Sequence, residues 1–154
     1  MKRRDCLQGM GAIALLPLAH TPFPQWKVYR KLHLFIVVNR EDAAAYDWGQ
    51  AIAHTLADEL PESRAMVTRA HDALRLASLI STQQLDVALL SRSALTAWQD
   101  QQPPYDQLEP THLQELFEVE DYVLISRDDF RAEHAGWIRE TLQAHLSAKS
   151  AFSR

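Results

Sequence analysis

Residues 32–38 read LHLFIVV, a nearly continuous apolar run that decides the fold and predicts a strand covered on both faces. Residues 39–42 follow as a loop and helix cap that ends at Asp42, and then a helical pattern continues to Leu60 and ends at Pro61. A buried strand followed by a helix is the unit of a parallel sheet, because the helix carries the chain back across the sheet.

This strand–helix unit recurs three more times. Strands are predicted for residues 64–69, 86–90 and 122–126, where apolar and β-branched side chains are frequent. The helices after them are expected to start at the cap residues Asp72, Ser91 or Ser93, and Asp128 or Asp129. Two of these helices have apolar stripes with helical spacing: Ala73, Leu76, Ala77 and Ile80 in one, and Ala135, Ile138, Leu142 and Leu146 in the other.

The remaining segments connect these units. Residues 99–110 are polar and rich in proline, as is typical of a surface crossing, and residues 113–118 form either one helical turn or the entry to a strand. We therefore predict an α/β fold for residues 32–148: a single, doubly wound, mainly parallel sheet with helices on both faces.

The first twenty residues resemble an export signal. Lys2, Arg3 and Arg4 precede an apolar run, residues 9–19, that suits a signal core but is too short to span a bilayer. The stretch Arg3-Arg4-Asp5-Cys6-Leu7-Gln8 resembles the twin-arginine motif, although Cys6 stands where the motif usually has Phe. The alternative is a partly apolar N-terminal tail.

We expect residues 1–20 to be a twin-arginine-like signal, residues 21–31 a linker and residues 149–154 a tail. This organisation predicts a periplasmic protein. Because Pro17-Leu18-Ala19 is a poor cleavage site, an uncleaved signal could anchor the chain, and the membrane is expected to be contacted only in that way.

The composition argues against several classes of function. The net charge is −4 and no basic run lies beyond the N-terminus, so we expect no nucleic-acid partner. Cys6 is the only cysteine, and the seven histidines lack metal-ligand spacing. No GxSxG elbow or glycine-rich phosphate loop is present. We therefore predict no catalytic residues, no metal and no cofactor.

Two stretches resemble one lobe of a type-2 periplasmic solute-binding protein, of the TAXI/TRAP-receptor or phosphonate-receptor kind. The first is residues 81–91, STQQLDVALLS, and the second is residues 122–130, YVLISRDDF, with residues 137–142, WIRETL, behind it. The resemblance implies a non-enzymatic transport receptor. Such receptors have two lobes that close on a ligand, and residues 99–110 stand where the second lobe would be inserted.

Three loops are expected to meet at the carboxyl edge of the sheet, namely residues 39–40, 68–71 and 91–93. Helix N-termini at this edge favour anions. The arginines of these loops, Arg40, Arg69 and Arg92, could form bidentate contacts with a carboxylate or phosphonate. The complete candidate ligand site consists of Asn39, Arg40, Thr68, Arg69, His71, Ser91, Arg92 and Ser93. The alternative is that the three arginines are surface residues paired with neighbours such as Glu41 and Asp72.

The sequence therefore predicts an exported binding protein that holds a small anionic ligand at this edge. The main alternative is an accessory or assembly protein that docks on an exported respiratory enzyme, because twin-arginine export suits the companions of cofactor-loaded enzymes. A homodimer is possible: two copies that face each other would favour ligand binding, whereas a monomer would favour protein docking.

Overall fold

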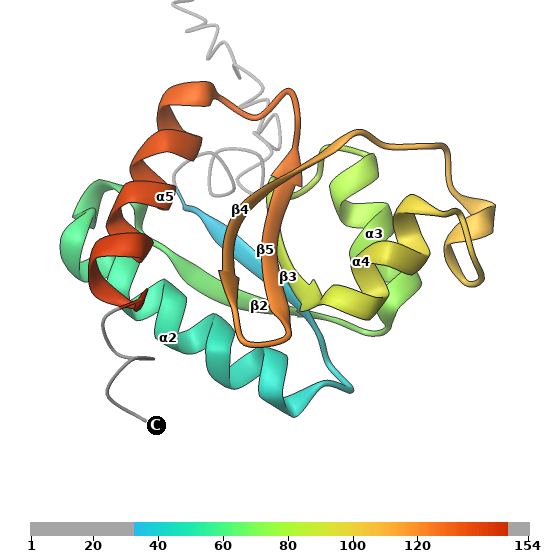
Figure 1. The fold of residues 1–154 in the computed structure, drawn as a ribbon, viewed down its shortest axis with the longest axis horizontal. Coiled ribbons are helices and arrows are strands. Elements are labelled where there is room, and N and C mark those ends of the chain that lie inside the picture. Colours follow the sequence, from blue (N-terminus) through green and yellow to red (C-terminus); the bar gives the residue numbers. More distant parts are fainter. Residues whose placement is uncertain (1–32, 148–154) are drawn as a thin grey trace, which may run out of the picture.

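The computed structural model describes residues 33–147, so the expected signal, linker and C-terminal tail lie outside the described residues. Within this range the chain forms five strands and four α-helices (Figure 1). The strands are β1 (Phe35–Asn39), β2 (Met66–Ala70), β3 (Val87–Ser91), β4 (Leu113–Val119) and β5 (Tyr122–Arg127). The helices are α2 (Ala43–Glu59), α3 (Ala73–Ser81), α4 (Arg92–Gln99) and α5 (Ala132–His145).

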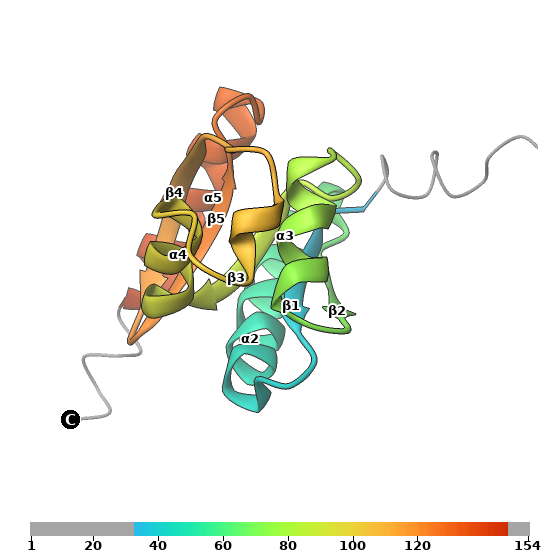
Figure 2. The same cartoon turned by 90° about the vertical axis from the view of Figure 1, so that its right-hand side faces the viewer.

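The strands form one mixed sheet in the order β2-β1-β3-β5-β4. Figure 2 shows β2 towards one end of this sheet and β4 and β5 towards the other. Strand β1 pairs in parallel with both β2 and β3, whereas β5 runs antiparallel to β3 and to β4. The predicted α/β class is confirmed, but the prediction of a fourth parallel strand–helix unit is wrong.

The β4–β5 hairpin is the reason for this difference. Residues 113–119 form a full strand rather than a helical turn, and Val119 pairs with Tyr122 across a loop made of Glu120 and Asp121. Glu120 has a φ of 51°, the left-handed conformation that lets the chain reverse so tightly. The reversal places Arg127, at the end of β5, at the opposite edge of the sheet from the predicted ligand loops.

Two apolar cores cover the sheet. Alternate residues of a strand point to opposite faces, and those of β3 divide in this way between the cores. Val87 and Leu89 join the buried residues of α2 and α5, whereas Ala88 and Leu90 join those of α3 and α4. Figure 1 shows the same two pairs of helices on either side of the strands. The alternation therefore divides the four helices between two separate cores.

The predicted helix starts are confirmed for three of the four helices. The side chains of Asp42, Asp72 and Ser91 accept hydrogen bonds from the N–H groups of Ala45, Arg75 and Ala94. The last helix differs from the prediction, because its N-cap is Arg131, which makes no side-chain capping bond. Asp129 lies two residues before this N-cap, and its carboxylate is bound by Arg127 instead.

Most of the apolar residues in the predicted strands are buried. Ile36, Val87, Leu89, Val123 and Ile125 are fully buried in strands, and Leu34 packs against the first core just before β1. Gly49 is also explained by packing, because a Cβ atom at this position would lie 3.2 Å from Cγ1 of Val38. None of the helices within residues 33–147 is long and apolar enough to cross a membrane.

Replacing Leu89 by Ala tests the central position of β3. Leu89 is fully buried in the first core, so we expect its truncation to lower the free energy of unfolding by about 2–4 kcal/mol through lost burial and a residual cavity. Urea unfolding followed by circular dichroism measures the change. Truncation of the half-buried Leu79, the control, should have a clearly smaller effect, and equal effects would contradict the assignment of Leu89 to the core.

Candidate functional site

The three predicted ligand loops lie at one edge of the sheet. Asn39 pairs with Ala70 across β1 and β2, and the register of β1 with β3 places Ser91 at the same end. Helices α2, α3 and α4 start at this edge, so the topology on which the site prediction depended is present. The predicted site also requires the arginine side chains to converge at this edge.

Arg69 points to the α2 face of the sheet. It lies within β2 rather than in a loop, opposite Val38, whose side chain belongs to the core formed with α2 and α5. Its guanidinium carbon lies 3.7 Å from the centre of the Tyr46 ring on α2. This is a cation–π contact within the molecule, and it orients Arg69 over the helix.

Arg92 points to the opposite face. Its Nη1 atom donates to Oε1 of Glu115 at 2.6 Å, and its Nη2 atom lies 2.9 Å from Oε2 of Glu118. Both glutamates stand on β4 opposite residues of the second core, Ile125 and Val123, so they share the face of α3 and α4. The hydrogen bonds to Glu115 and Glu118 raise the pKa of the Arg92 guanidinium.

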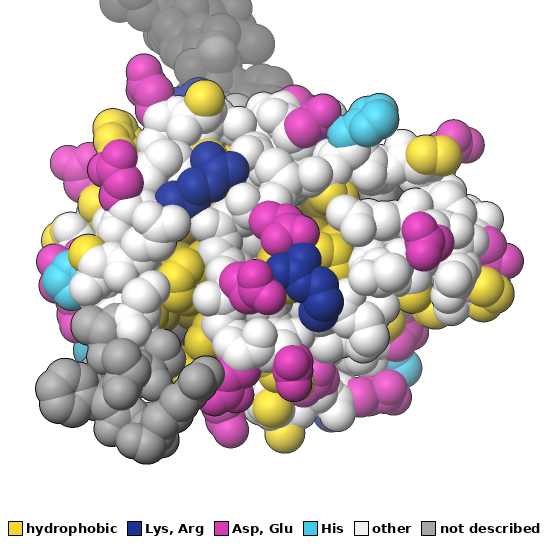
Figure 3. All heavy atoms as spheres, in the orientation of Figure 1, with side chains coloured by type: hydrophobic (Ala, Val, Ile, Leu, Met, Phe, Trp, Pro, Cys, Tyr) yellow, Lys and Arg dark blue, Asp and Glu magenta, His cyan; other side chains and the backbone are white. Residues whose placement is uncertain are grey.

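The structure therefore brings the three loops to one edge of the sheet, but it does not bring the three guanidinium groups together. Arg69 and Arg92 lie on opposite faces and each has a partner within the chain, while Arg40 is exposed. Figure 3 shows part of this arrangement over β4 and β5, where acidic side chains flank a basic one.

The other predicted site residues contribute mainly to local structure. The Asn39 side chain accepts a hydrogen bond from the Glu41 N–H group, and Thr68 is half-buried within β2. His71 is paired with its neighbour Asp72 at 3.3 Å. Ser91 caps α4, and its Oγ atom lies 3.1 Å from Oγ of Ser93.

The electrostatics of this edge disfavour an anion. The carboxylates of Asp42 and Asp72 already occupy the N-termini of α2 and α3, where an anionic ligand was expected. The hydroxyl group of Tyr122 donates to Asp42 at 2.8 Å, and Glu120 and Asp121 lie in the adjacent hairpin loop. Burial, the hydrogen bond to Asp42 and these negative charges together raise the pKa of Tyr122 to about 12.

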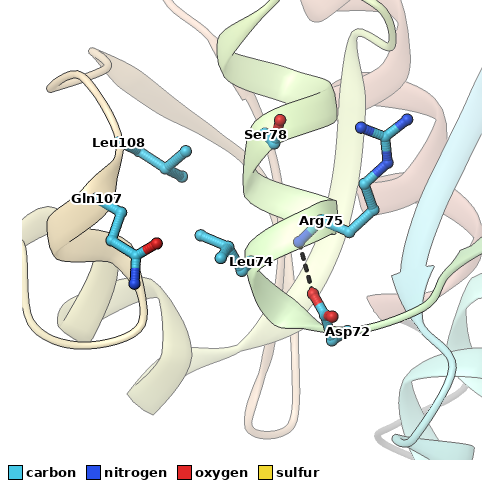
Figure 4. A pocket seen from close by; sticks show the side chains of 6 residues that line it. All are labelled: Asp72, Leu74, Arg75, Ser78, Gln107 and Leu108. Atoms are coloured by element: carbon cyan, nitrogen blue, oxygen red, sulfur yellow. Dashed lines mark hydrogen bonds between the residues drawn. The ribbon is translucent and has the colours of Figure 1, made fainter.

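A shallow concavity lies elsewhere, between α3 and the turn at Tyr105–Gln107. It has a volume of about 330 Å³ and is lined by Asp72, Leu74, Arg75, Ser78, Gln107 and Leu108. Figure 4 shows Leu74 and Leu108 facing each other across it, with the Arg75 side chain directed away. It includes none of the predicted ligand residues. Within residues 33–147, no group of three or more His, Cys, Asp or Glu side chains could hold a metal ion.

Arg127 and its neighbours form a structural cluster at the opposite edge. The Arg127 guanidinium binds both carboxylate oxygens of Asp129 and donates to the carbonyl of Ile80 at 3.1 Å, near the end of α3. Desolvation raises the pKa of the nearby Asp86 carboxyl. Arg127, in the stretch YVLISRDDF, thus links β5 to α3.

An aromatic row at the start of α5, of which Trp137 is the exposed member, was not included in the predicted site. The ring centroids of Phe130 and His134 are 6.1 Å apart, and those of His134 and Trp137 are 5.5 Å apart. Trp137 is 53% exposed. We call these three residues the α5 aromatic surface. The positions of His134 and Trp137, away from the buried stripe of the helix, are the signal that could have identified this surface.

A scan of protein families and a search of curated proteins found no match to this chain.

Replacing Arg92 by Ala tests whether the ion pairs of this arginine stabilise the contact between α4 and β4. We expect the free energy of unfolding to fall by about 0.5–1 kcal/mol, because the variant loses partly exposed ion pairs between α4 and β4. The difference from the wild type should shrink in high salt, which screens exposed charges. Urea unfolding at low and high salt measures it, and Arg40→Ala is the control. An equal loss of unfolding free energy in both variants would argue against a stabilising role of the Arg92 ion pairs.

Replacing Tyr122 by Phe tests the electrostatics of the same edge. At pH 7 we expect a loss of about 1 kcal/mol, because the hydrogen bond to Asp42 disappears. The folded-state pKa of Tyr122 is about 12, above its ordinary value of 10.0, so its contribution is complete below pH 10 and is lost as the pH rises towards 12. The wild type should therefore lose its advantage over Tyr122→Phe in this window. Denaturant unfolding across that range measures the effect, and a constant difference would contradict it.

Proposed function

We propose that this chain is an exported, non-enzymatic binding protein that docks on a protein partner through the α5 aromatic surface. The twin-arginine-like pattern at Arg3 and Arg4 supports export. A folded redox enzyme exported with its cofactor is a suitable class of partner for a protein that takes this route. The exposure of Trp137 is the observation that carries the docking proposal.

The geometry of the predicted ligand edge favours docking over anion binding. A small ligand needs a concave site that covers most of its surface and presents a few convergent polar groups. Here Arg69 and Arg92 diverge, and two of the helix N-termini at this edge are capped by aspartates. The concavity beside α3 is shallow and lies apart from these groups. An anion receptor would therefore have to rearrange its own ion pairs before it bound its ligand.

The α5 aromatic surface has the features of a protein contact. Tryptophan is enriched among the residues that dominate interface energies, because it buries a large area with few rotatable bonds. The half-buried Phe130 packs against the first core, so it joins the exposed Trp137 to the interior of the domain. His134 and Trp137 are thereby held on a helix that is anchored to the core, which lowers the entropy lost on binding.

Photo-crosslinking tests this proposal in the cells from which the chain comes. The full chain is expressed with benzoylphenylalanine in place of Trp137, and in matched variants with the same residue at Arg40 or at His54. Position 40 reports on the predicted ligand edge, and His54 is an exposed control on α2. We expect one specific adduct from position 137, because the probe then lies within the interface, and no adduct from position 54.

The other outcomes are informative. An adduct from position 40 alone would move the docking surface to the carboxyl edge of the sheet. If no position gives an adduct, and calorimetry detects a small carboxylate or phosphonate binding to the wild type at millimolar concentration, the anion-receptor function replaces the docking function.

A further inference from the structure

The exposed side of α5 around Trp137 is acidic. Glu133 and Glu140 lie four residues before and three residues after Trp137, so all three side chains lie on the same side of the helix. All three are exposed. Within residues 33–147, neither carboxylate forms a hydrogen bond or an ion pair. The indole is thus flanked by two negative charges that have no partner in the described part of the domain.

The basic groups near this side of the helix are mostly engaged elsewhere. Arg139 donates to Oε1 of Gln114 at 2.9 Å and to the carbonyl of Glu115, which turns it towards β4. His145, at the end of the helix, lies 3.5 Å from Glu59 on α2. Arg131 is exposed at the N-terminal end, and His134 stacks against Trp137. The segment from Glu133 to Glu140 therefore presents carboxylates to an approaching molecule.

Gly136 adds a second unusual feature beside Trp137. A Cβ atom placed on Gly136 would meet nothing within 4 Å, so packing inside the domain does not require glycine there. Glycine within a helix is less favourable than alanine, because the unfolded chain has more conformational freedom. The absence of a side chain leaves room for another chain to approach the helix beside the indole.

We infer that the partner segment that docks on α5 is cationic. An Arg or Lys side chain packs on the Trp137 ring, and its charge is balanced by Glu133 and Glu140. Aromatic rings attract cations through their negative faces, and guanidinium groups stack on them readily. The chain forms this type of contact within itself, where Arg69 lies over Tyr46. This inference rests on the proposed docking function and adds the chemistry of the partner.

Nuclear magnetic resonance of the full chain tests this inference with a defined probe. The indole N–H signal of Trp137, assigned with Trp137→Phe, is followed while a hexa-arginine peptide is added, and a hexa-glutamate peptide serves as the opposite-charge control. We expect a saturable shift with hexa-arginine only. The variant Glu133→Gln with Glu140→Gln should bind about tenfold more weakly. The matched control, Glu62→Gln with Glu109→Gln, removes the same charge from exposed positions elsewhere and should bind like the wild type.

Three outcomes would overturn the inference. The first is the absence of any shift of the Trp137 signal at millimolar hexa-arginine. The second is an equal weakening of hexa-arginine binding in the matched control, which would indicate unspecific attraction to an acidic protein. The third is movement of the Trp137 signal, without peptide, in a variant with Lys27→Glu, Arg30→Glu and Lys31→Glu, because residues of the same chain would then occupy the surface. If crosslinking from position 137 still captures a partner while hexa-arginine fails to bind, the docking function stands and the cationic partner is rejected.

Discussion

The β4–β5 hairpin reverses the chain within Glu120 and Asp121, and the position of every later element depends on this reversal. Because β5 returns antiparallel between β3 and β4, it ends at the edge of the sheet opposite the starts of α2, α3 and α4. Helix α5 therefore starts from that opposite edge and packs beside α2. The same hairpin brings Glu115 and Glu118 of β4 within reach of Arg92, so one local turn determines both the course of the last helix and the charge balance at the predicted site.

The carboxyl edge of the sheet shows why a favourable topology does not by itself make an anion site. Helix N-termini attract negative charge whatever its source, and a carboxylate from the chain itself is always present at high effective concentration. Asp42 and Asp72 satisfy the helix ends, and Asp42 also accepts a hydrogen bond from Tyr122 across 80 residues of sequence. These contacts stabilise the fold, and an external anion would have to compete with them.

The sequence was sufficient to predict features that depend on residues close together in the chain. The caps Asp42, Asp72 and Ser91 and the buried stripe of α5 follow from local spacing, and the structure confirms them. Strand β4 was harder to predict, because a bulge between Glu115 and Phe117 places two buried residues, Leu116 and Phe117, next to each other and breaks the alternation of a strand. The direction of β5 is not encoded within β5 at all, since it depends on the length of the hairpin loop.

The candidate site illustrates the same limit at the level of side chains. The edge of the sheet near which Arg40, Arg69 and Arg92 lie could be predicted, but the directions of the guanidinium groups depend on partners far away in the chain, such as Tyr46 for Arg69 and Glu115 for Arg92. An exposed residue is different, because it needs no distant partner within the domain. Helical spacing alone separates Trp137 from the buried stripe of Ala135, Ile138 and Leu142. Trp137 lies on the outer side of the helix, between two carboxylates and beside a glycine that packing does not require. Folding of this domain does not explain this arrangement, whereas binding of a cationic partner would explain it.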